Sequence, residues 1–327
     1  KMSKHLGNAV NPFDQIEKYG ADAVRFYMMT NSEPWDNLKY DEKGVDEVRR
    51  KFFGTLYNTY SFFSGYANVD AFDNETAQVP VAERPEIDRW VLSVLNTLVK
   101  GVQKEMESYD PTRAGRLIED FVNNDLSNWY VRLNRKRFWG KEMSQDKLAA
   151  YQTLYTCLTT VAKLLAPFAP FFADQLFCDL GAAQLENTTS VHLAKFPVAD
   201  ESLIDRELEE RMGMAQKITS MVHALRKKVN IAVRQPLQAI MIPAVDDEQR
   251  RHIEAVKDLI LSEVNVKELR FVEGSGVLVK KVKCNFRTMG KKFGKLMKGI
   301  AAAMSALDQD QIAELETNGK IAVEVEG

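Results

Sequence analysis

The sequence predicts a mainly α-helical protein, in which an antiparallel helix bundle is followed by a small α+β domain. Three observations support this prediction. Apolar residues recur at three- and four-residue steps in several long segments with shortish connections, as in helix bundles. The clearest of these segments is 110–139. After Pro236 the composition changes to short, β-rich runs that alternate with helical ones.

Segment 110–139 has the features of one long helix. Asp110 can cap the first free amides, and Pro111 suits the first helical position. One apolar stripe follows, formed by Leu117, Ile118, Phe121, Val122, Leu126, Trp129, Tyr130 and Leu133. Because Trp129 and Tyr130 lie on this stripe, we expect them to pack in the core rather than stack on bases.

The other bundle helices are predicted from the same signals. We expect helices over the segments 12–19, 21–30, 43–66, 86–109, 144–166 and 203–228. Gly20 should end the first helix, and Pro167 and Pro170 should break the apolar stretch that follows 144–166. Segments 69–83 and 181–200 are expected to be a linker and a loop.

The last part of the chain combines strands with a basic block. Strands are expected at 237–243, 266–272, 277–284 and 321–325, and helices at 246–263, 291–307 and 309–316. Residues 274–307 include no acidic residue but contain Lys280, Lys281, Lys283, Arg287, Lys291, Lys292, Lys295 and Lys298. The spacing of Lys291, Lys295 and Lys298 predicts one cationic ridge on a helix. Such a block indicates a polyanion-binding surface.

Composition limits the classes of protein that fit. A chain of 327 residues should form two or more domains, and its net charge of -2 requires any nucleic-acid site to come from local clustering. No apolar run has transmembrane length and no signal peptide is recognisable, which favours a cytoplasmic protein without membrane contact. Cys157, Cys178 and Cys284 are far apart and form no CxxC pair, as expected in a reducing compartment.

Two further clusters of basic residues could bind phosphate groups. The predicted helix 110–139 ends in a basic group with an aromatic residue beyond it: Arg132, Arg135, Lys136, Arg137 and Trp139. Cations suit the negative end of a helix dipole and are also what a phosphate backbone needs. At the start of the chain, Lys1 and Lys4 flank Met2 and Ser3. Two lysines on a mobile loop can neutralise a triphosphate as charge moves to its leaving group.

Several motifs together resemble the class I aminoacyl-tRNA synthetases. KMSKHLGN resembles the KMSKS signature of that class. It is followed by YGADAVRFYM, DRWVLSVLN and DLSNWYVRLNRKRFW, which are similar to the segments after the signature loop in the isoleucine, valine and leucine enzymes. RKKVNIAVRQPL, SEVNVKELRFV and NFRTMGKKFGKLMK resemble the C-terminal part of the isoleucine enzymes.

The resemblance implies a division into three parts. Residues 1–42 would be the KMSKS-type loop and connecting helices of the catalytic domain, 43–235 an anticodon-binding helix bundle, and 236–327 a small C-terminal α+β domain. The whole enzyme would attach isoleucine to tRNA(Ile) through an aminoacyl-adenylate, using ATP with Mg²⁺ and releasing AMP and diphosphate. Its catalytic and editing domains would lie upstream, so this stretch alone is expected to be inactive. No cysteine-rich zinc module is present, so no metal is expected in this stretch.

The resemblance also suggests roles for individual residues. Lys1 and Lys4 match the motif lysines that stabilise the ATP phosphates, and Ser3 matches as well, whereas His5 stands where the family often has serine. Charge and position make Arg132, Arg135, Arg137 and Trp139 candidates for the anticodon surface. Candidates for contacts with the tRNA backbone are Arg234, Lys280, Lys281, Lys291 and Lys295.

Two alternatives remain open at this point. The chain could be the corresponding region of a valine or leucine enzyme, which the amino-acid pocket upstream would distinguish. It could also be a non-enzymatic RNA-binding or scaffold protein built on the same bundle. That alternative predicts a native start near Lys1, whereas the synthetase hypotheses predict that the native chain begins far upstream of Lys1.

Overall fold

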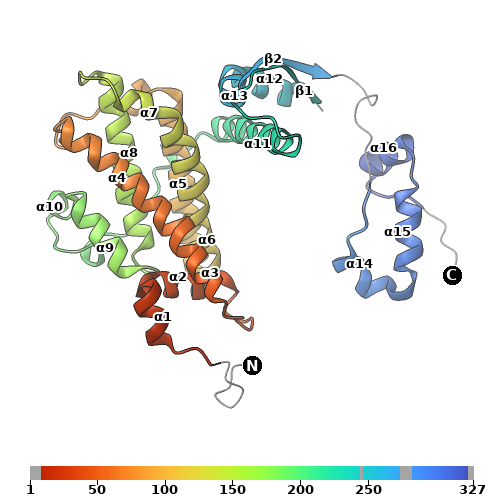
Figure 1. Cartoon of the computed structure of the whole chain (residues 1–327), viewed down its shortest axis with the longest axis horizontal. Helices are drawn as coiled ribbons and strands as arrows, with labels where there is room; N and C mark the ends of the chain where they lie inside the picture. Colours follow the sequence, from red (N-terminus) through yellow and green to blue (C-terminus); the bar gives the residue numbers. More distant parts are fainter. Residues whose placement is uncertain (1–8, 244–245, 273–281, 323–327) are drawn as a thin grey trace. The chain divides into compact units, whose positions relative to one another are not determined.

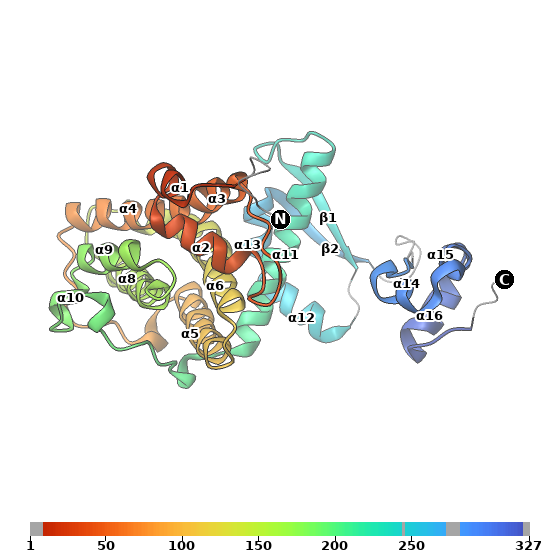
Figure 2. The same ribbon diagram turned by 90° about the horizontal axis from the view of Figure 1, so that it is seen from below.

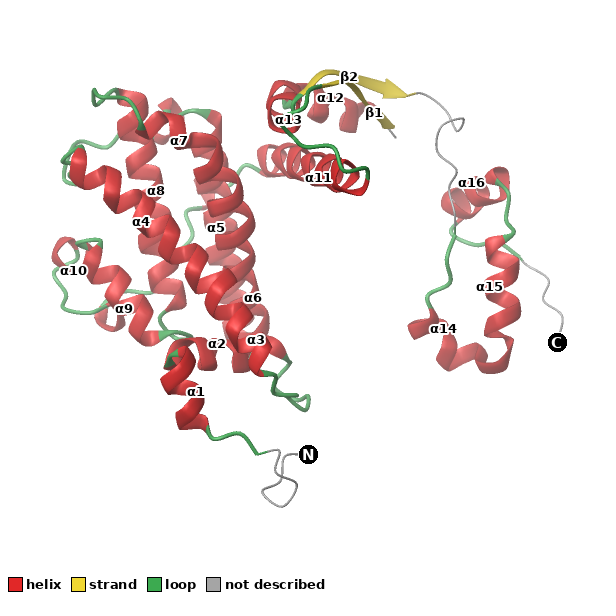
Figure 3. Ribbon diagram, viewed as in Figure 1, coloured by secondary structure: helices red, strands yellow, loops and turns green. Residues whose placement is uncertain are grey.

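The computed structural model describes residues 9–243, 246–272 and 282–322, and most of them are helical (Figures 1 and 3). The chain divides into two compact units, Lys1–Gln216 and Lys217–Gly327. The division falls within one helix, α11 (Arg206–Lys228). Helix and strand content agree with the predicted mainly α architecture.

The first unit is an antiparallel helix bundle. Its α-helices are α1 (Pro12–Tyr19), α2 (Ala21–Asn31), α3 (Glu42–Val48), α4 (Gly54–Val69), α5 (Glu86–Glu107), α6 (Pro111–Asp120), α7 (Arg132–Phe138), α8 (Gln145–Leu165), α9 (Pro170–Asp179) and α10 (Ala182–Leu185). The π-helical segment Arg49–Phe53 joins α3 to α4, and a second, Phe121–Val131, joins α6 to α7. Figures 1 and 2 show α8 lying between α5 and α9.

Contacts near the helix ends give the direction of the long helices. Arg137, near the end of α7, binds Asp88 at the start of α5 and Asp146 at the start of α8. Phe63, towards the end of α4, lies with its ring centroid 6.1 Å from that of Tyr151 near the start of α8. Successive long helices therefore run in opposite directions, which confirms the predicted bundle.

The π-helical segment Phe121–Val131 has a physical reason in the spacing of the buried residues. The buried face of the helix advances in steps of four residues: Ile118, Val122, Leu126, Tyr130, Asn134 and Phe138. On an α-helix of 3.6 residues per turn, steps of four drift around the axis. The wider π turn reduces this drift. Trp129 and Tyr130 are buried, as the sequence predicted.

Helix α2, which follows the first helix of the chain, is tied closely to the bundle. A Cβ atom at Gly115 would lie 2.6 Å from Thr30 Cγ2, so only glycine permits this approach of α6 to α2. Arg116 Nε donates to the Thr30 carbonyl oxygen at 2.8 Å, and Thr112 Oγ1 donates to the Met29 carbonyl oxygen at 2.7 Å. The segment that follows the lysine motif is thereby held against α6.

The second unit contains a small parallel sheet and a set of short helices. After α11 come β1 (Leu237–Pro243), α12 (Asp247–Ala255), α13 (Lys257–Val264), β2 (Val266–Val272), α14 (Phe286–Phe293), α15 (Met297–Ser305) and α16 (Gln309–Asn318). The two strands pair in parallel, with Leu237 opposite Val266 and Pro243 opposite Val272. Helices α12 and α13 make the crossover that a parallel pair requires.

Several predicted elements of the second unit are corrected. The single helix predicted at 246–263 is interrupted at Val256, which has φ −112° and ψ 14°. The helix predicted at 291–307 is replaced by α14, a 3₁₀ turn over Gly294–Leu296, and α15. Gly294 has φ +41°, a conformation that suits glycine. Lys291 and Lys295 therefore do not lie on one continuous α-helix, so the single helix on which the cationic ridge was predicted is wrong.

The remaining differences concern a loop and two strands. The loop predicted at 181–200 contains α10 and a 3₁₀ turn at Val191–Leu193, and Gly181 at φ +70° redirects the chain into α10. Of the strand predicted at 277–284, residues 282–284 have no regular structure and the others lie outside the described residues. The strand predicted at 321–325 lies mostly outside them too.

Asp125 in the first unit should make the stability of the bundle depend on pH. Burial raises its pKa to about 6, although Gln216 Nε2 donates to its Oδ1 at 2.9 Å. The unfolded value is about 3.9, so the folded chain binds more protons between about pH 4 and 6, and stability falls as pH rises through that window. Asp125→Asn should therefore stabilise the chain by about 1–3 kcal/mol at pH 7 to 8 in urea titrations.

The gain should become small near pH 4, because both side chains are then neutral in the folded protein. A gain for Asp125→Asn that is the same at pH 4 and pH 8 would contradict the pKa assignment. Glu107→Asn, at an exposed position, is a control that should lack this pH dependence.

Candidate nucleic-acid interface

The candidate ATP-binding residues are outside the part of the chain that the structure describes. These residues are Lys1, Ser3 and Lys4. Two tRNA-binding candidates of the second unit, Lys280 and Lys281, also lie outside the described part. Lys291 lies in α14 and Lys295 in the 3₁₀ turn after it, at positions whose side chains are not described. The geometry of a nucleic-acid interface therefore comes from the C-terminal end of α7 and from the turn that carries Arg234.

Helix α7 and the residue that follows it present a basic and aromatic surface, here called the basic ridge: Arg132, Arg135, Lys136 and Trp139. All four side chains are exposed, and Trp139 is 57% exposed despite its large apolar ring. Arg132, Arg135 and Trp139 follow at steps of three and four residues, so they share one face of the helix. The guanidinium of Arg132 also lies 5.9 Å from the Trp129 ring centroid.

The sequence explains why these residues face solvent. On the opposite face, Tyr130, Asn134 and Phe138 are buried in the bundle. The free carbonyl groups at the end of a helix attract cations, so the arginines are electrostatically favoured where they stand. The basic ridge therefore displays cations and one exposed indole on a helix whose other face is locked into the core.

Arg137 lies close to the basic ridge in sequence but has a different environment. Its guanidinium donates to both carboxylate oxygens of Asp88, at 2.6 and 2.8 Å, and to Asp146. Its side chain is only 14% exposed. Burial by itself would lower the Arg137 pKa, but the hydrogen bonds to Asp88 outweigh it and raise the pKa. We therefore assign Arg137 to positioning the end of α7 rather than to the exposed surface.

Asp88 is the centre of this buried network. It is fully buried at the start of α5, and its Oδ1 also accepts a hydrogen bond from the Tyr130 hydroxyl at 2.8 Å. Burial and the nearby carboxylate raise the pKa of Tyr130 well above its ordinary value, so the phenol remains a donor. The π-helical segment and α7 are thus both bound to α5 at one carboxylate, next to the basic ridge. The sequence contained no signal for this network beyond an Asp near a helix start.

The chain that leaves α7 is held by a second buried cation. Lys147, on α8, is almost fully buried and lies with its Nζ 2.5 Å from Asp70 Oδ2. The same ammonium donates to the Gly140 carbonyl oxygen at 2.6 Å. The turn directly after Trp139 is therefore anchored to α8, which limits the freedom of the exposed indole.

In the second unit, a buried arginine holds the turn that carries Arg234. Arg234 is exposed, and the Gln235 amide closes the turn by donating to the Ala232 carbonyl oxygen at 3.0 Å. Arg226, buried at the end of α11, donates to the carbonyl oxygens of both Ala232 and Gln235. Its other nitrogen donates to the Val264 carbonyl oxygen just before β2. Arg226 therefore fixes the turn on which Arg234 is displayed.

A metal-binding cluster and a membrane-spanning helix are both absent from residues 9–243, 246–272 and 282–322. No group of three or more His, Cys, Asp or Glu side chains in these segments is placed to hold a metal ion. None of the helices described there combines the length and apolar character needed to cross a membrane.

Comparison with known proteins identifies the family. Residues 88–241 match the anticodon-binding domain of tRNA ligase, and residues 1–41 match the class I tRNA synthetases (I, L, M and V). Isoleucine–tRNA ligase from Bacteroides thetaiotaomicron is 67% identical over 100% of this chain and 28% of its own length. The Porphyromonas gingivalis enzyme is 60% identical over 100% and 28%, and the Clostridium novyi enzyme 40% over 100% and 31%.

Among solved structures, the ternary complex of Agrobacterium radiobacter K84 agnB2 LeuRS with tRNA and LeuAMS is similar in fold. The similarity covers 63% of this chain and 23% of the LeuRS chain, at 20% identity and a TM-score of 0.47. This chain spans less than a third of the length of the ligases that it matches. The match extends through the lysine motif, the bundle and the second unit. The chain therefore belongs to the class I tRNA synthetases, and it corresponds to a stretch of isoleucine–tRNA ligase that includes the anticodon-binding domain.

Proposed function

We propose that this chain is the tRNA-holding part of an isoleucine–tRNA ligase. The whole enzyme would use ATP with Mg²⁺ to form an isoleucyl-adenylate and then transfer isoleucine to tRNA(Ile), in the cytoplasm. The partners of this stretch would be tRNA(Ile) and the catalytic and editing domains of the same protein. Identities of 60% and 67% to isoleucine–tRNA ligases over the entire chain favour this proposal over the valine or leucine enzymes.

The single observation that carries tRNA binding is the basic ridge. The chain has a net charge of -2, so a polyanion must be bound by a local cluster of cations. Single-stranded anticodon bases can be splayed out, stacked on aromatic rings or arginine planes, and recognised by their edges. Trp139 offers such a ring, with Arg135 four residues before it on the same face. Arg234 and the lysines of 280–298 would contact the tRNA backbone.

A physical argument supports a separate tRNA-binding part. Isoleucine and valine differ by one methylene group, which a pocket discriminates by only about 10–200-fold. Accuracy at the amino-acid end therefore depends on editing, whereas the identity of the tRNA must be recognised elsewhere. A rigid bundle that displays cations and an aromatic ring fits that second task.

The chain with Arg135→Ala and Trp139→Ala should bind the anticodon stem-loop of tRNA(Ile) about tenfold more weakly, or worse. Loss of base stacking accounts for most of this effect, since stacking contributes about 1–3 kcal/mol per base. If Arg135 also contacts a phosphate, the slope of log K against log salt should fall by about 0.7. Fluorescence anisotropy over a series of salt concentrations measures both quantities.

Lys104→Ala is the matched control for this experiment. Lys104 is exposed near the end of α5, and the start of α5 lies at the basic ridge, so roughly 20–25 Å of helix separates the two sites. The control should leave affinity and salt slope unchanged. Equal affinity of the double variant and the original chain would overturn the assignment of the ridge. Equal binding of unrelated single-stranded RNA would favour the non-enzymatic scaffold, and tighter binding of tRNA(Val) or tRNA(Leu) the other enzymes.

A further inference from the structure

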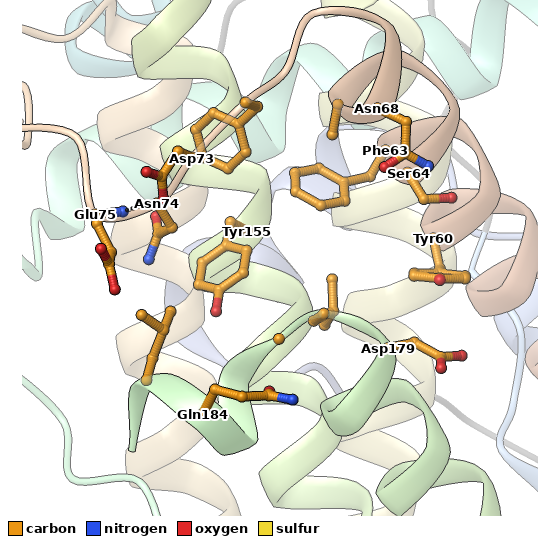
Figure 4. A pocket seen from close by; sticks show the side chains of 15 residues that line it. Tyr60, Phe63, Ser64, Asn68, Asp73, Asn74, Glu75, Tyr155, Asp179 and Gln184 are labelled. Atoms are coloured by element: carbon orange, nitrogen blue, oxygen red, sulfur yellow. Dashed lines mark hydrogen bonds between the residues drawn. The ribbon is translucent and has the colours of Figure 1, made fainter. Parts of the chain in front are cut away.

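A second possible binding site lies in the first unit. It is a pocket of about 380 Å³ formed by α4, α8, α9, α10 and the segment after α4 (Figure 4). Ligand pockets in proteins commonly have volumes of about 300–1,000 Å³. The polar residues that line it include Asp73, Glu75, Tyr155, Asp179 and Gln184. The aromatic side chains of Phe63 and Phe72 provide part of its apolar wall.

The buried hydroxyl of Tyr155 indicates that the pocket binds a ligand. It lies on α8 and is only 7% exposed, yet its hydroxyl has no hydrogen-bond partner within the described part of the chain. Figure 4 shows this hydroxyl directed into the pocket, towards the side where Gln184 lies. A buried hydroxyl without a partner destabilises a protein, so a ligand that bonds to it would recover that free energy.

The charges around the pocket select the class of ligand. Asp73, Glu75 and Asp179 are exposed carboxylates at the pocket, and none of the described residues that line it is Lys, Arg or His. Asp73 accepts one hydrogen bond from the Glu75 amide, and Asp179 accepts one from Gln175 Nε2. A carboxylate can accept about four, so both retain acceptor capacity. The pocket therefore favours cations and disfavours phosphates.

We propose that this pocket binds a small organic ammonium ion with an aliphatic body. One ammonium N–H group would donate to the Tyr155 oxygen. The carboxylates of Glu75 and Asp179, which Figure 4 shows on opposite sides of the pocket, would attract the cation, and the methylene groups would pack against Phe63. Aromatic faces add attraction for the cation. Burial raises the pKa of Tyr155 to about 12, so its hydroxyl is neutral at physiological pH and its oxygen can accept from an ammonium group. The site is distinct from the basic ridge, which has the opposite charge.

The probe for the test is 1,4-diaminobutane, and the neutral probe of the same length is 1,4-butanediol. Isothermal titration of the chain should give saturable binding of the diamine and none of the diol. Tyr155→Phe should weaken diamine binding about tenfold, since it removes a hydrogen bond to a charged group. Asp179→Asn should weaken it about two- to fivefold. Without ligand, Tyr155→Phe should keep or raise the melting temperature, because the hydroxyl has no hydrogen-bond partner among the described residues.

Glu107→Gln is the charge-matched control, since it removes one carboxylate at an exposed position that does not line the pocket. It should leave the affinity for the diamine unchanged. The proposal is overturned if the chain does not bind the diamine, if the diol binds equally well, or if Tyr155→Phe leaves the affinity unchanged. Equal weakening by Glu107→Gln and Asp179→Asn would also overturn it, because the attraction would then be general electrostatics.

Discussion

Replacement of Asp88 by alanine should destabilise the chain by about 3–5 kcal/mol, the usual result of removing one partner from a buried ion pair. Asp88 is fully buried and binds the guanidinium of Arg137 through both oxygens. Without it, Arg137 would retain, among the described residues, its contacts with Asp146 and Asn134, and the Tyr130 hydroxyl would lose its acceptor. Guanidinium denaturation monitored by circular dichroism measures the change.

Asp146→Ala provides the matched comparison. Asp146 binds the same guanidinium, but its side chain is 52% exposed. Loss of such an exposed partner should cost no more than about 1 kcal/mol. Similar destabilisation by the two substitutions would contradict the dominance of the buried pair. In conditions where Asp88→Ala remains folded, tRNA affinity should also decrease, since the end of α7 that carries Arg135 and Trp139 loses its anchor.

Replacement of Lys4 by alanine in the complete ligase should slow adenylate formation by about 10²–10³-fold. This is the usual effect of removing one donor that stabilises charge in the transition state. The expectation depends on the match of Lys4 to the second lysine of the KMSKS-type motif, in the segment that matches the class I synthetases. The rate of ATP–pyrophosphate exchange with isoleucine measures adenylation directly.

Lys39→Ala is a suitable control, because the Lys39 side chain is exposed and the substitution keeps its backbone carbonyl, which accepts from the Tyr27 hydroxyl. The Lys39 variant should exchange pyrophosphate at the original rate, and both variants should bind tRNA(Ile) normally. An unchanged exchange rate for Lys4→Ala would remove Lys4 from the mechanism. A loss of tRNA affinity alone would assign Lys4 to tRNA binding instead.

Much of the architecture could be predicted because it depends on local pattern. The apolar stripe of 110–139 predicted both the helix and the burial of Trp129 and Tyr130. Gly20, with φ +87°, separates α1 and α2 where the sequence indicated a break. Such signals act within a few residues of the chain, so they survive in the folded protein. The lysine motif and its neighbours likewise indicated the family without knowledge of the fold.

Only the tertiary structure distinguished between residues of the same type. Arg135 and Arg137 are two positions apart on a helix, and in sequence both are basic residues near its end. They point in different directions around the helix, so Arg135 faces solvent while Arg137 meets Asp88, which lies 49 residues away in the sequence. The pocket at Tyr155 likewise joins residues from 60 to 185. Long-range contacts of this kind depend on how helices pack, and helical periodicity contains no information about which helix a given face will meet.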